Sequence, residues 1–336
     1  MMITLPYSAP RRRMALIATL GMFSIFLSGV PGAGFAQTYP DRPIRIVVPT
    51  AAGGPTDVLA RLVGEQLRTA LGQTAVIDNR GGAGGAIAAR AVAAAPADGY
   101  TLLFGNTATL ATVPAVSKGA GYDPAKAFAA VAKVMDSYQV LVVSPDLPIN
   151  SVAELLAYAK ANPGKLNFST AGIGNITHLS GELLKAKSGI EFVAVHYKSG
   201  AESLNSILGG QSHLTVENIT AVRALVQDRR LRALAVTSST RKSEFPELPT
   251  MIEAGVTDYV VTSFFGIVAP AGTPAPIIAK LNAVINDGLR TEALLTSLRR
   301  LGAQPTPEAP APFQTLIASE TKKWADIANT TKISLE

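Results

Sequence analysis

Residues 44–71, IRIVVPTAAGGPTDVLARLVGEQLRTAL, run through an apolar segment, a loop of small residues and an amphipathic segment in direct succession. The branched apolar run Ile44–Val48 predicts a buried strand. Apolar side chains then recur at helical spacing, at Leu59, Leu62, Val63, Leu67, Ala70 and Leu71. This spacing predicts a helix from Thr56 to Leu71, ended by Gly72. A strand, a tight loop and a helix in this order are typical of α/β proteins.

Short apolar runs continue to alternate with helix-period segments along the rest of the chain. Further strands are predicted at 75–77, 100–104, 140–143, 166–169, 192–195, 214–216, 234–236 and 260–268. A capping box of Ser151 and Glu154 predicts a helix through Ala161, another helix follows Gly174, and three helical segments finish the chain. The alternation predicts α/β layers with mostly parallel sheets.

The first 36 residues have the order of a secretory signal peptide. Arg11–Arg13 precede the apolar segment Met14–Leu27, and the small-residue stretch Gly34–Ala36 follows. The apolar segment matches the roughly 7–15 residues of a signal peptide and falls short of the about 20 that a membrane span needs. We therefore expect cleavage near Ala36 and export to the periplasm, with the general secretory and twin-arginine routes both open.

The composition limits what the mature chain can do. Removing residues 1–36 takes away three arginines and no acid, so the formal charge falls from +6 to +3, and 300 residues remain for two domains. Without a Lys/Arg run in the mature chain, and with only 6% aromatic residues, nucleic acid is not an expected partner. The absence of cysteine excludes thiol catalysis, thiolate metal sites and disulfides. His178, His196 and His213 lie far apart, so no metal and no cofactor are expected.

Two loops of small residues, 49–57 and 169–178, each lie between a predicted strand and a predicted helix. Small residues let a ligand approach the backbone, and the amides at a helix N-terminus carry partial positive charge. One such loop is commonly just a tight turn, but two, one in each expected domain, favour a shared cleft. The predicted ligand-binding residues are Thr50, Ala51, Ala52, Gly53, Gly54, Thr56, Asp57, Ser169, Thr170, Gly172, Gly174, Asn175, His178 and Glu217.

Other motifs are weaker indications of function. The glycine-rich segment 79–85 lacks the Gly-Lys-Ser/Thr of a phosphate loop, and we interpret it as a turn with glycine at unusual backbone angles. No G-x-S-x-G elbow is present. His178 near Ser169 and Asp57 is the one combination that suggests catalysis, and nine residues separate His178 from Ser169. Glu217, between a strand and a helix, is either a surface charge at the helix start or a polar contact in the cleft.

The assembled segments resemble the periplasmic receptors of the tripartite tricarboxylate transporters, the Bug receptors, over essentially the whole mature chain. The resemblance rests on residues 39–44, Ala52-Gly53-Gly54 with Asp57, 71–73, 78–80, 82–85, 98–102, 159–164, Gly172-Ile173-Gly174 with His178 and Glu182, 231–237 and 269–274. Glu217 stands where the family pattern usually has aspartate, and Phe264 where it often has tryptophan.

The resemblance implies a periplasmic binding protein fold (type II-like), with a ligand cleft between two α/β domains that closes on the ligand. We expect one domain to comprise 37–138 with 260–336 and the other 139–259. It also implies that the loops at 50–57 and 169–178 hold ligand carboxylates, partly through backbone amides and ordered water. The expected partner is a two-component membrane permease, and the expected state is a monomer.

The sequence therefore predicts an exported solute-binding protein, without catalysis of its own, that captures a small organic carboxylate. An exported ligand sensor is an alternative that the sequence does not separate from a transport receptor. An exported hydrolase is disfavoured by the missing catalytic residues. The identity of the carboxylate stays open, and we hypothesise that Glu217 reaches the cleft and selects the far end of the ligand.

Overall fold

The computed structural model describes residues 1–4, 39–53, 55–300 and 304–331. The chain divides into two compact units, Met1–Asp41 and Arg42–Glu336, and every element below lies in the second. Of the predicted signal peptide, only residues 1–4 are described; the rest of it and its cleavage site lie in 5–38, outside the described residues, and so does Gly54. No described helix is long and apolar enough to span a bilayer.

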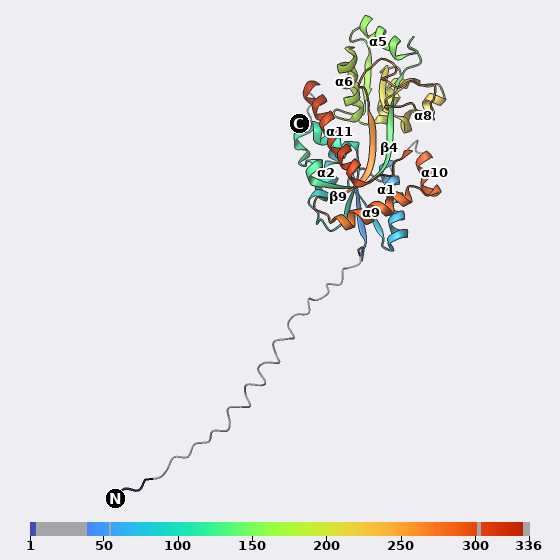
Figure 1. The fold of residues 1–336 in the computed structure, drawn as a ribbon. Coiled ribbons are helices and arrows are strands. Elements are labelled where there is room, and N and C mark those ends of the chain that lie inside the picture. The colour runs from blue at the N-terminus through green and yellow to red at the C-terminus, as the bar shows by residue number, and fades with distance from the viewer. Residues whose placement is uncertain (5–38, 54, 301–303, 332–336) are drawn as a thin grey trace. The chain divides into compact units, whose positions relative to one another are not determined.

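The strands and helices alternate through the second unit (Figure 1). The strands are β1 (Ile44–Val48), β2 (Ala75–Asn79), β3 (Thr101–Asn106), β4 (Phe128–Val143), β5 (Asn167–Thr170), β6 (Val193–His196), β7 (Leu214–Asn218), β8 (Arg232–Val236), β9 (Thr262–Pro270) and β10 (Gln304–Pro305). The α-helices are α1 (Pro55–Leu71), α2 (Ala86–Ala93), α3 (Val113–Val116), α4 (Pro124–Ala127), α5 (Val152–Ala161), α6 (Ile176–Ser188), α7 (Gly200–Leu208), α8 (Ile219–Gln227), α9 (Ala275–Gly288), α10 (Glu292–Arg300) and α11 (Pro310–Thr331). Three short turns of other helix types are η1 (Ala83–Gly85), η2 (Ala108–Thr112) and η3 (Lys118–Ala120).

The strand order is β2-β1-β3-β9-β4-β7-β5-β6, with β8 and β10 also paired to β4. Strands β2, β1 and β3 run parallel to one another, and so do β6, β5 and β7. We call these two strand groups, with the helices that follow their strands, the first lobe and the second lobe. The predicted parallel pairing holds within each lobe, whereas β4, β8, β9 and β10 pair antiparallel.

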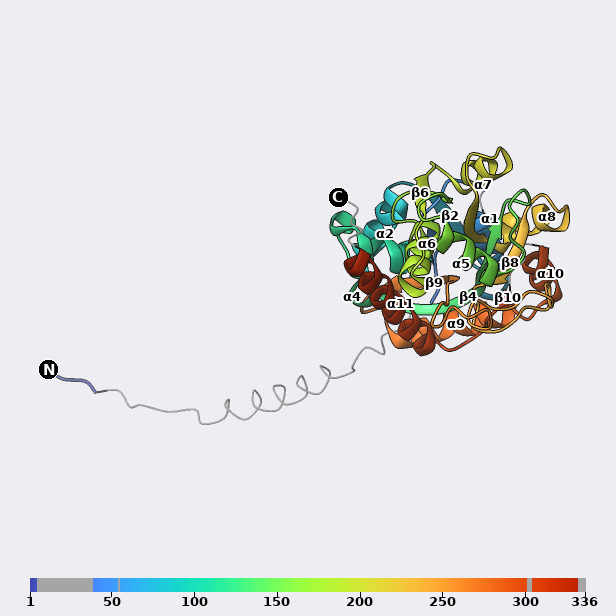
Figure 2. The same cartoon turned by 90° about the horizontal axis from the view of Figure 1, so that it is seen from above.

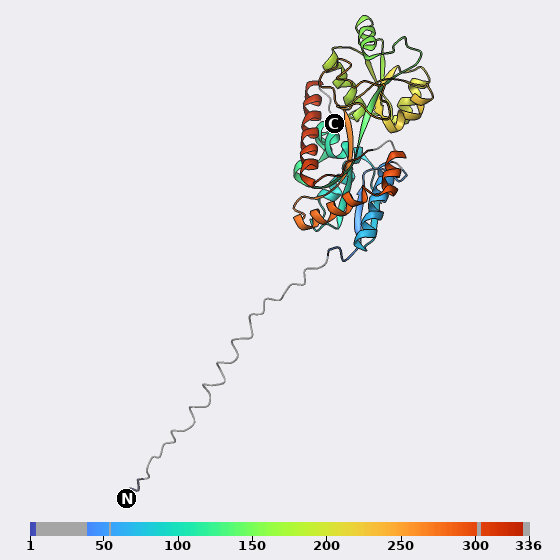
Figure 3. The same ribbon diagram turned by 45° about the vertical axis from the view of Figure 1, so that its right-hand side comes forward.

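Strand β4 lies between the two lobes and connects them. Its residues Phe128–Tyr138 pair with β9, and Gln139–Val143 pair with β7. Figures 1 and 3 show β4 and β9 running between the two lobes. The sequence predicts a strand only over the apolar end, 140–143. The rest was missed because it is interrupted by polar residues, which here are paired: Lys133 with Asp136, Ser137 with Asn218, and Gln139 with Ser263.

Side chains alternate along the end of β4 between two hydrophobic clusters. Leu141 and Val143 pack in one cluster with Leu155 of α5 and Leu184 of α6. Val140 and Val142 pack in the other cluster, on the side of α7 and α8. Because successive strand residues face opposite sides of a sheet, the second lobe is a sheet covered by helices on both faces.

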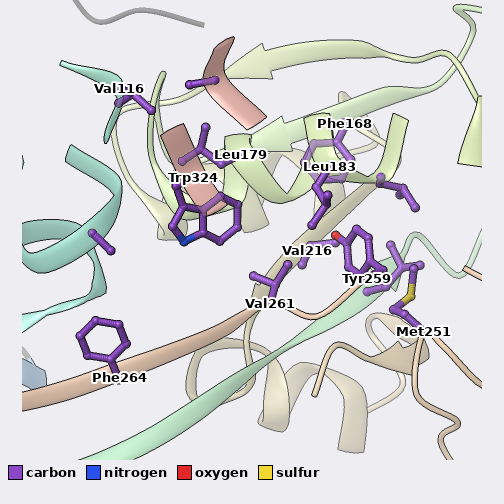
Figure 4. Packing of buried hydrophobic residues seen from close by; sticks show 14 of the residues in the cluster. Val116, Phe168, Leu179, Leu183, Val216, Met251, Tyr259, Val261, Phe264 and Trp324 are labelled. Carbon is purple, nitrogen blue, oxygen red and sulfur yellow. The ribbon is translucent and has the colours of Figure 1, made fainter. Parts of the chain in front are cut away.

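Helix α11 packs against elements of both lobes, contacting η2, α3 and α4 as well as α6. In Figure 2, α4 and α11 lie on one side of the unit, and α8 and α10 on the other. Trp324 of α11 is fully buried, and its indole N–H donates to Glu320 Oε2 at 3.0 Å. Figure 4 shows Trp324 in a cluster that also holds Val116 of the first lobe and Leu179 of the second.

The predicted capping box of α5 is only half formed. The Ser151 hydroxyl accepts the Glu154 amide at 3.1 Å, as a helix cap should. The Glu154 carboxylate, however, accepts the amide of Asn150 at 2.7 Å, not that of the cap residue. It still satisfies a backbone donor beside the start of the helix.

Candidate ligand-binding site

The carboxyl ends of the parallel strands carry the loops that matter for binding. In the first lobe, β1, β2 and β3 lead into the loops at 49–53, 80–85 and 107–112. In the second lobe, β5 and β6 lead into the loops at 171–175 and 197–199. Ligands of open α/β sheets bind outside the carboxyl ends of the strands, so these loops are the expected place for a site.

A cavity of about 480 Å³ lies between these loops. Its volume falls within the about 300–1,000 Å³ that is usual for small-molecule sites. Residues of both lobes line it: Ala83, Gly84, Ala108, Thr112, Val113 and Ser117 from the first lobe, and Ala171, Ile173, Gly174, Asn175 and Lys198 from the second.

In the first loop, Asp57 is a structural acceptor. Its Oδ2 accepts the Gly53 amide at 2.9 Å and the Arg61 guanidinium at 3.0 Å. Its Oδ1 accepts from Asn79 at 3.1 Å, and the same Asn79 amide group donates to the carbonyl of Thr50 at 3.1 Å. The hydrogen bond from Arg61 holds the pKa of Asp57 below its usual value, although burial opposes it. Asp57 therefore stays ionised and fixes the loop from within.

His178 is the structural acceptor of the second loop. Its Nδ1 accepts the amide of Gly174 at 3.1 Å, so the neutral ring carries its proton on Nε2. Burial, helped by the neighbouring His196 and opposed by Glu182, lowers the pKa of His178 to about 4. His178 is thus neutral near pH 7 and holds Gly174 in place rather than contributing charge to a ligand.

Three more polar side chains shape the second loop. The Thr177 hydroxyl accepts the Ala171 amide at 2.8 Å, and Asn175 caps α6 by accepting the Thr177 amide at 3.1 Å. Thr170 accepts the Gly172 amide at 3.3 Å and lies 2.8 Å from Nδ1 of His196. Since Gly172 donates to Thr170, the Thr170 hydroxyl proton is free to go to His196.

Ser169 lies below this loop, in the second lobe. It is fully buried, and its hydroxyl accepts from Ser203 at 2.8 Å. His178 accepts the amide of Gly174 instead. Ser169 and His178, both described residues, are not hydrogen-bonded to each other. The one combination in the sequence that suggested catalysis is not assembled as a nucleophile and its base.

Glu217 is buried at the end of β7, with 7% of its surface exposed. Its Oε1 accepts the Asn218 amide at 2.8 Å, and Oε2 has no hydrogen-bond partner among the described residues. A Cβ placed on Gly200, the first residue of α7, would lie 3.0 Å from Oε2. Burial raises the pKa of Glu217 to about 7, against the bond from Asn218. Glu217 is not among the residues that line the cavity.

Of the predicted site residues, the structure brings Gly174 and Asn175 to the cavity wall. Thr56, Asp57, Ser169, Thr170 and His178 are buried beside or beneath the two loops, and Ala51–Gly53 are exposed. Lys198 and the wall formed by η1, η2 and α3 are not among the residues predicted from the sequence. Ala83 and Gly84 sit in the glycine-rich segment that was interpreted as a turn only. Their position after the carboxyl end of β2 was the signal that could have found them.

A cavity walled by the carboxyl ends of two α/β lobes, which share crossing strands, defines the class of two-domain solute-binding proteins. The profile described as "Tripartite tricarboxylate transporter family receptor" matches residues 59–333. Protein BugT of Bordetella pertussis is 37% identical over 322 residues, covering 96% of this chain and 98% of BugT. The chain belongs to the tripartite tricarboxylate transporter receptor family.

Solved structures agree with this assignment. Rpa4515 of R. palustris, solved with adipate, shares 39% identity and a TM-score of 0.77, covering 88% of this chain and 99% of Rpa4515. MatC of Rhodopseudomonas palustris, with bound malate, shares 32% identity and a TM-score of 0.73, covering 86% of this chain and 99% of MatC. The family consists of solute-binding receptors, so this protein is a receptor and not an enzyme.

Proposed function

We propose that the protein captures a small organic carboxylate in the cavity between its lobes and delivers it to a two-component membrane permease. The observation that carries the proposal is the cavity itself, whose wall comes from both lobes and contains Lys198, a cation. The adipate and malate bound by two similar receptors support an organic acid as the ligand here.

In this proposal the loops at 50–57 and 169–178 hold one ligand carboxylate. Asp57 and His178 already accept the amides of Gly53 and Gly174, so these two side chains position the loops. The partial positive charge at the start of α6, a helix of 13 residues, favours an anion beside Asn175. Glu217 is buried at the end of β7 and lies outside the cavity wall, so this proposal gives it no role as a counter-charge for the ligand.

Ligand binding closes the two lobes about the strands that they share. The lobes we propose are 37–138 with 260–336, and 139–259. Strand β4 pairs with β9 up to Tyr138 and with β7 from Gln139 onward, and this change of pairing partner supports the boundary at 138/139. A ligand that touches both lobes favours the closed state. Trp324, the one tryptophan of the chain, packs among residues of both lobes and serves as a fluorescent reporter of closure.

Export to the periplasm and cleavage near Ala36 complete the proposal, and they rest on the arginine, apolar and small-residue order of 1–36. An intact-mass measurement of the protein from a periplasmic fraction should give a chain that begins near Gln37. A full-length, membrane-retained chain would contradict export.

A thermal-shift screen with mono-, di- and tricarboxylates tests the binding function. A ligand at about 100 times its dissociation constant should stabilise the protein by about 2.7 kcal/mol, and the positive compounds should change Trp324 fluorescence. A folded protein that no carboxylate stabilises would contradict the proposal.

A further inference from the structure

Lys198 has a distinctive place in the cavity. It lies between the end of β6 and the start of α7, and it is the charged side chain in the cavity wall as far as the described residues go. The other wall residues are small, apolar or uncharged polar. A single cation in such a wall attracts an anionic group and offers nothing to a neutral one.

The backbone of Lys198 is held in position by the start of α7. Its amide donates to Glu202 Oε2 at 3.1 Å, while the Ser199 hydroxyl accepts the Glu202 amide at 3.2 Å. The Glu202 carboxylate is therefore bonded to the backbone amide beside the cap residue Ser199, as Glu154 is at the start of α5. The Lys198 side chain is exposed and forms no ion pair with any described carboxylate. Its charge is therefore available to a ligand.

Uncharged residues of the cavity wall indicate what kind of ligand body would fit beside Lys198. The Thr112 hydroxyl is buried and has no hydrogen-bond partner among the described residues. Val113 adds an apolar surface, and Ile173 of the second lobe, 53% exposed, adds another. Apolar walls suit methylene groups, and an unpaired hydroxyl suits a ligand oxygen. The combination fits a linear aliphatic acid better than a compact, highly charged one.

We propose that Lys198 pairs with the second carboxylate of a linear aliphatic dicarboxylate and makes the receptor prefer dicarboxylates to monocarboxylates. This inference rests on the proposed function, in which the loops hold the first carboxylate. A charge-assisted hydrogen bond inside a closed cavity contributes more than one in open water. A monocarboxylate of equal length leaves Lys198 in water and gains nothing from it.

Calorimetry with matched acids tests the inference. The probes are succinate, glutarate and adipate, each compared with the monocarboxylate of the same length, butyrate, pentanoate or hexanoate. The variants are Lys198→Met, which keeps the apolar stem and removes the charge, and Lys198→Arg, which keeps the charge. Lys165→Met is the matched control, because Lys165 is an exposed lysine of the second lobe outside the cavity wall.

Wild type should bind the best dicarboxylate more tightly than its monocarboxylate. Lys198→Met should weaken binding of that dicarboxylate by roughly 10- to 100-fold and change the affinity for the monocarboxylate by less than about twofold. Lys198→Arg should retain most of the preference, and Lys165→Met all of it. Raising the salt concentration should reduce dicarboxylate binding to wild type but hardly affect Lys198→Met.

Two results would overturn the inference alone: Lys198→Met binding the dicarboxylate as wild type does, or weakening both acids of a pair equally. In both, wild type still binds carboxylates, so the proposed function stands. If folded wild type binds no acid of the panel or of the wider carboxylate screen, the proposed function fails and the inference fails with it.

Discussion

The amide of Gly174 donates to Nδ1 of His178, four residues further along the chain, at 3.1 Å. The first lobe repeats the arrangement, since the amide of Gly53 donates to Asp57, also four residues on, at 2.9 Å. In both lobes a side chain from the first turn of the following helix fixes the glycine of the preceding loop. The two loops are therefore pre-organised by residues with quite different chemistry, an anion and a neutral imidazole.

Replacing His178 tests this arrangement in the second lobe. His178→Ala leaves the Gly174 amide without its acceptor and should cost about 1–3 kcal/mol of unfolding free energy, with weaker ligand binding. His178→Asn places an amide oxygen near the position of Nδ1 and should recover much of both. Urea denaturation and calorimetry measure the two effects. Equal stability of His178→Ala and wild type would show that the bond does not order the loop.

Asp57 provides the same test in the first lobe. Asp57→Ala removes the acceptor of Gly53, Arg61 and Asn79, and should destabilise by about 1–3 kcal/mol. Asp57→Asn keeps an acceptor but loses the ion pair with Arg61, so it should destabilise the protein less than Asp57→Ala does. Since the two loops belong to separate lobes, the stability losses of Asp57→Ala and His178→Ala should add within about 0.5 kcal/mol. A larger coupling in the double variant would contradict independent ordering of the two loops.

Much of the first lobe follows from the sequence because its signals are local. The strand Ile44–Val48 and the helix through Leu71 were predicted almost to the residue, the helix beginning at Pro55 rather than Thr56. The predicted strand pieces in the second lobe also coincide with observed strands, although their ends move by one or two residues. Periodicity of apolar side chains is enough to place such elements.

The cavity wall could not be predicted in the same way. Thr112, Val113 and Lys198 come together only when the two lobes face each other, and no spacing in the chain reports that contact. Strand β4 was missed over most of its length because its polar residues find partners far away in sequence, such as Ser263 for Gln139. The hypothesis that Glu217 selects the far end of the ligand stays untested, and the structure suggests a different experiment for this residue.

Glu217→Gln should change how stability depends on pH. The folded pKa of Glu217 is about 7, above the ordinary value of 4.5, so the fold favours the protonated acid. The contribution of protonated Glu217 to the free energy of unfolding is complete below pH 4.5 and is lost as the pH rises through about 7. Glu217→Gln should therefore gain stability over wild type as the pH rises from 5 to 8, by up to the order of 3 kcal/mol. A constant difference between the two proteins in urea denaturation across this range would show that the buried carboxyl does not titrate as described.

Gly84 offers a direct way to fill the cavity. Its φ is +63°, and an added Cβ would lie 2.6 Å from Cγ2 of Val113, another wall residue. Gly84→Ala should weaken carboxylate binding by at least about tenfold, and it should cost more than the roughly 1–2 kcal/mol of a left-handed backbone because Val113 must also move.

Gly72 supplies the matched control, because its φ of +72° is similar and its added Cβ would meet nothing within 4 Å. Gly72→Ala should lose only the roughly 1–2 kcal/mol of the left-handed backbone and keep full affinity in calorimetry. If the two variants bind equally well, the ligand does not occupy the cavity beside Gly84.

A crystal structure with the tightest acid of the screen tests whether a small carboxylate binds between the lobes. We expect ligand density beside Gly84 and Thr112 of the first lobe and Asn175 and Lys198 of the second. Density at another place on the protein, with this cavity empty of ligand, would contradict it.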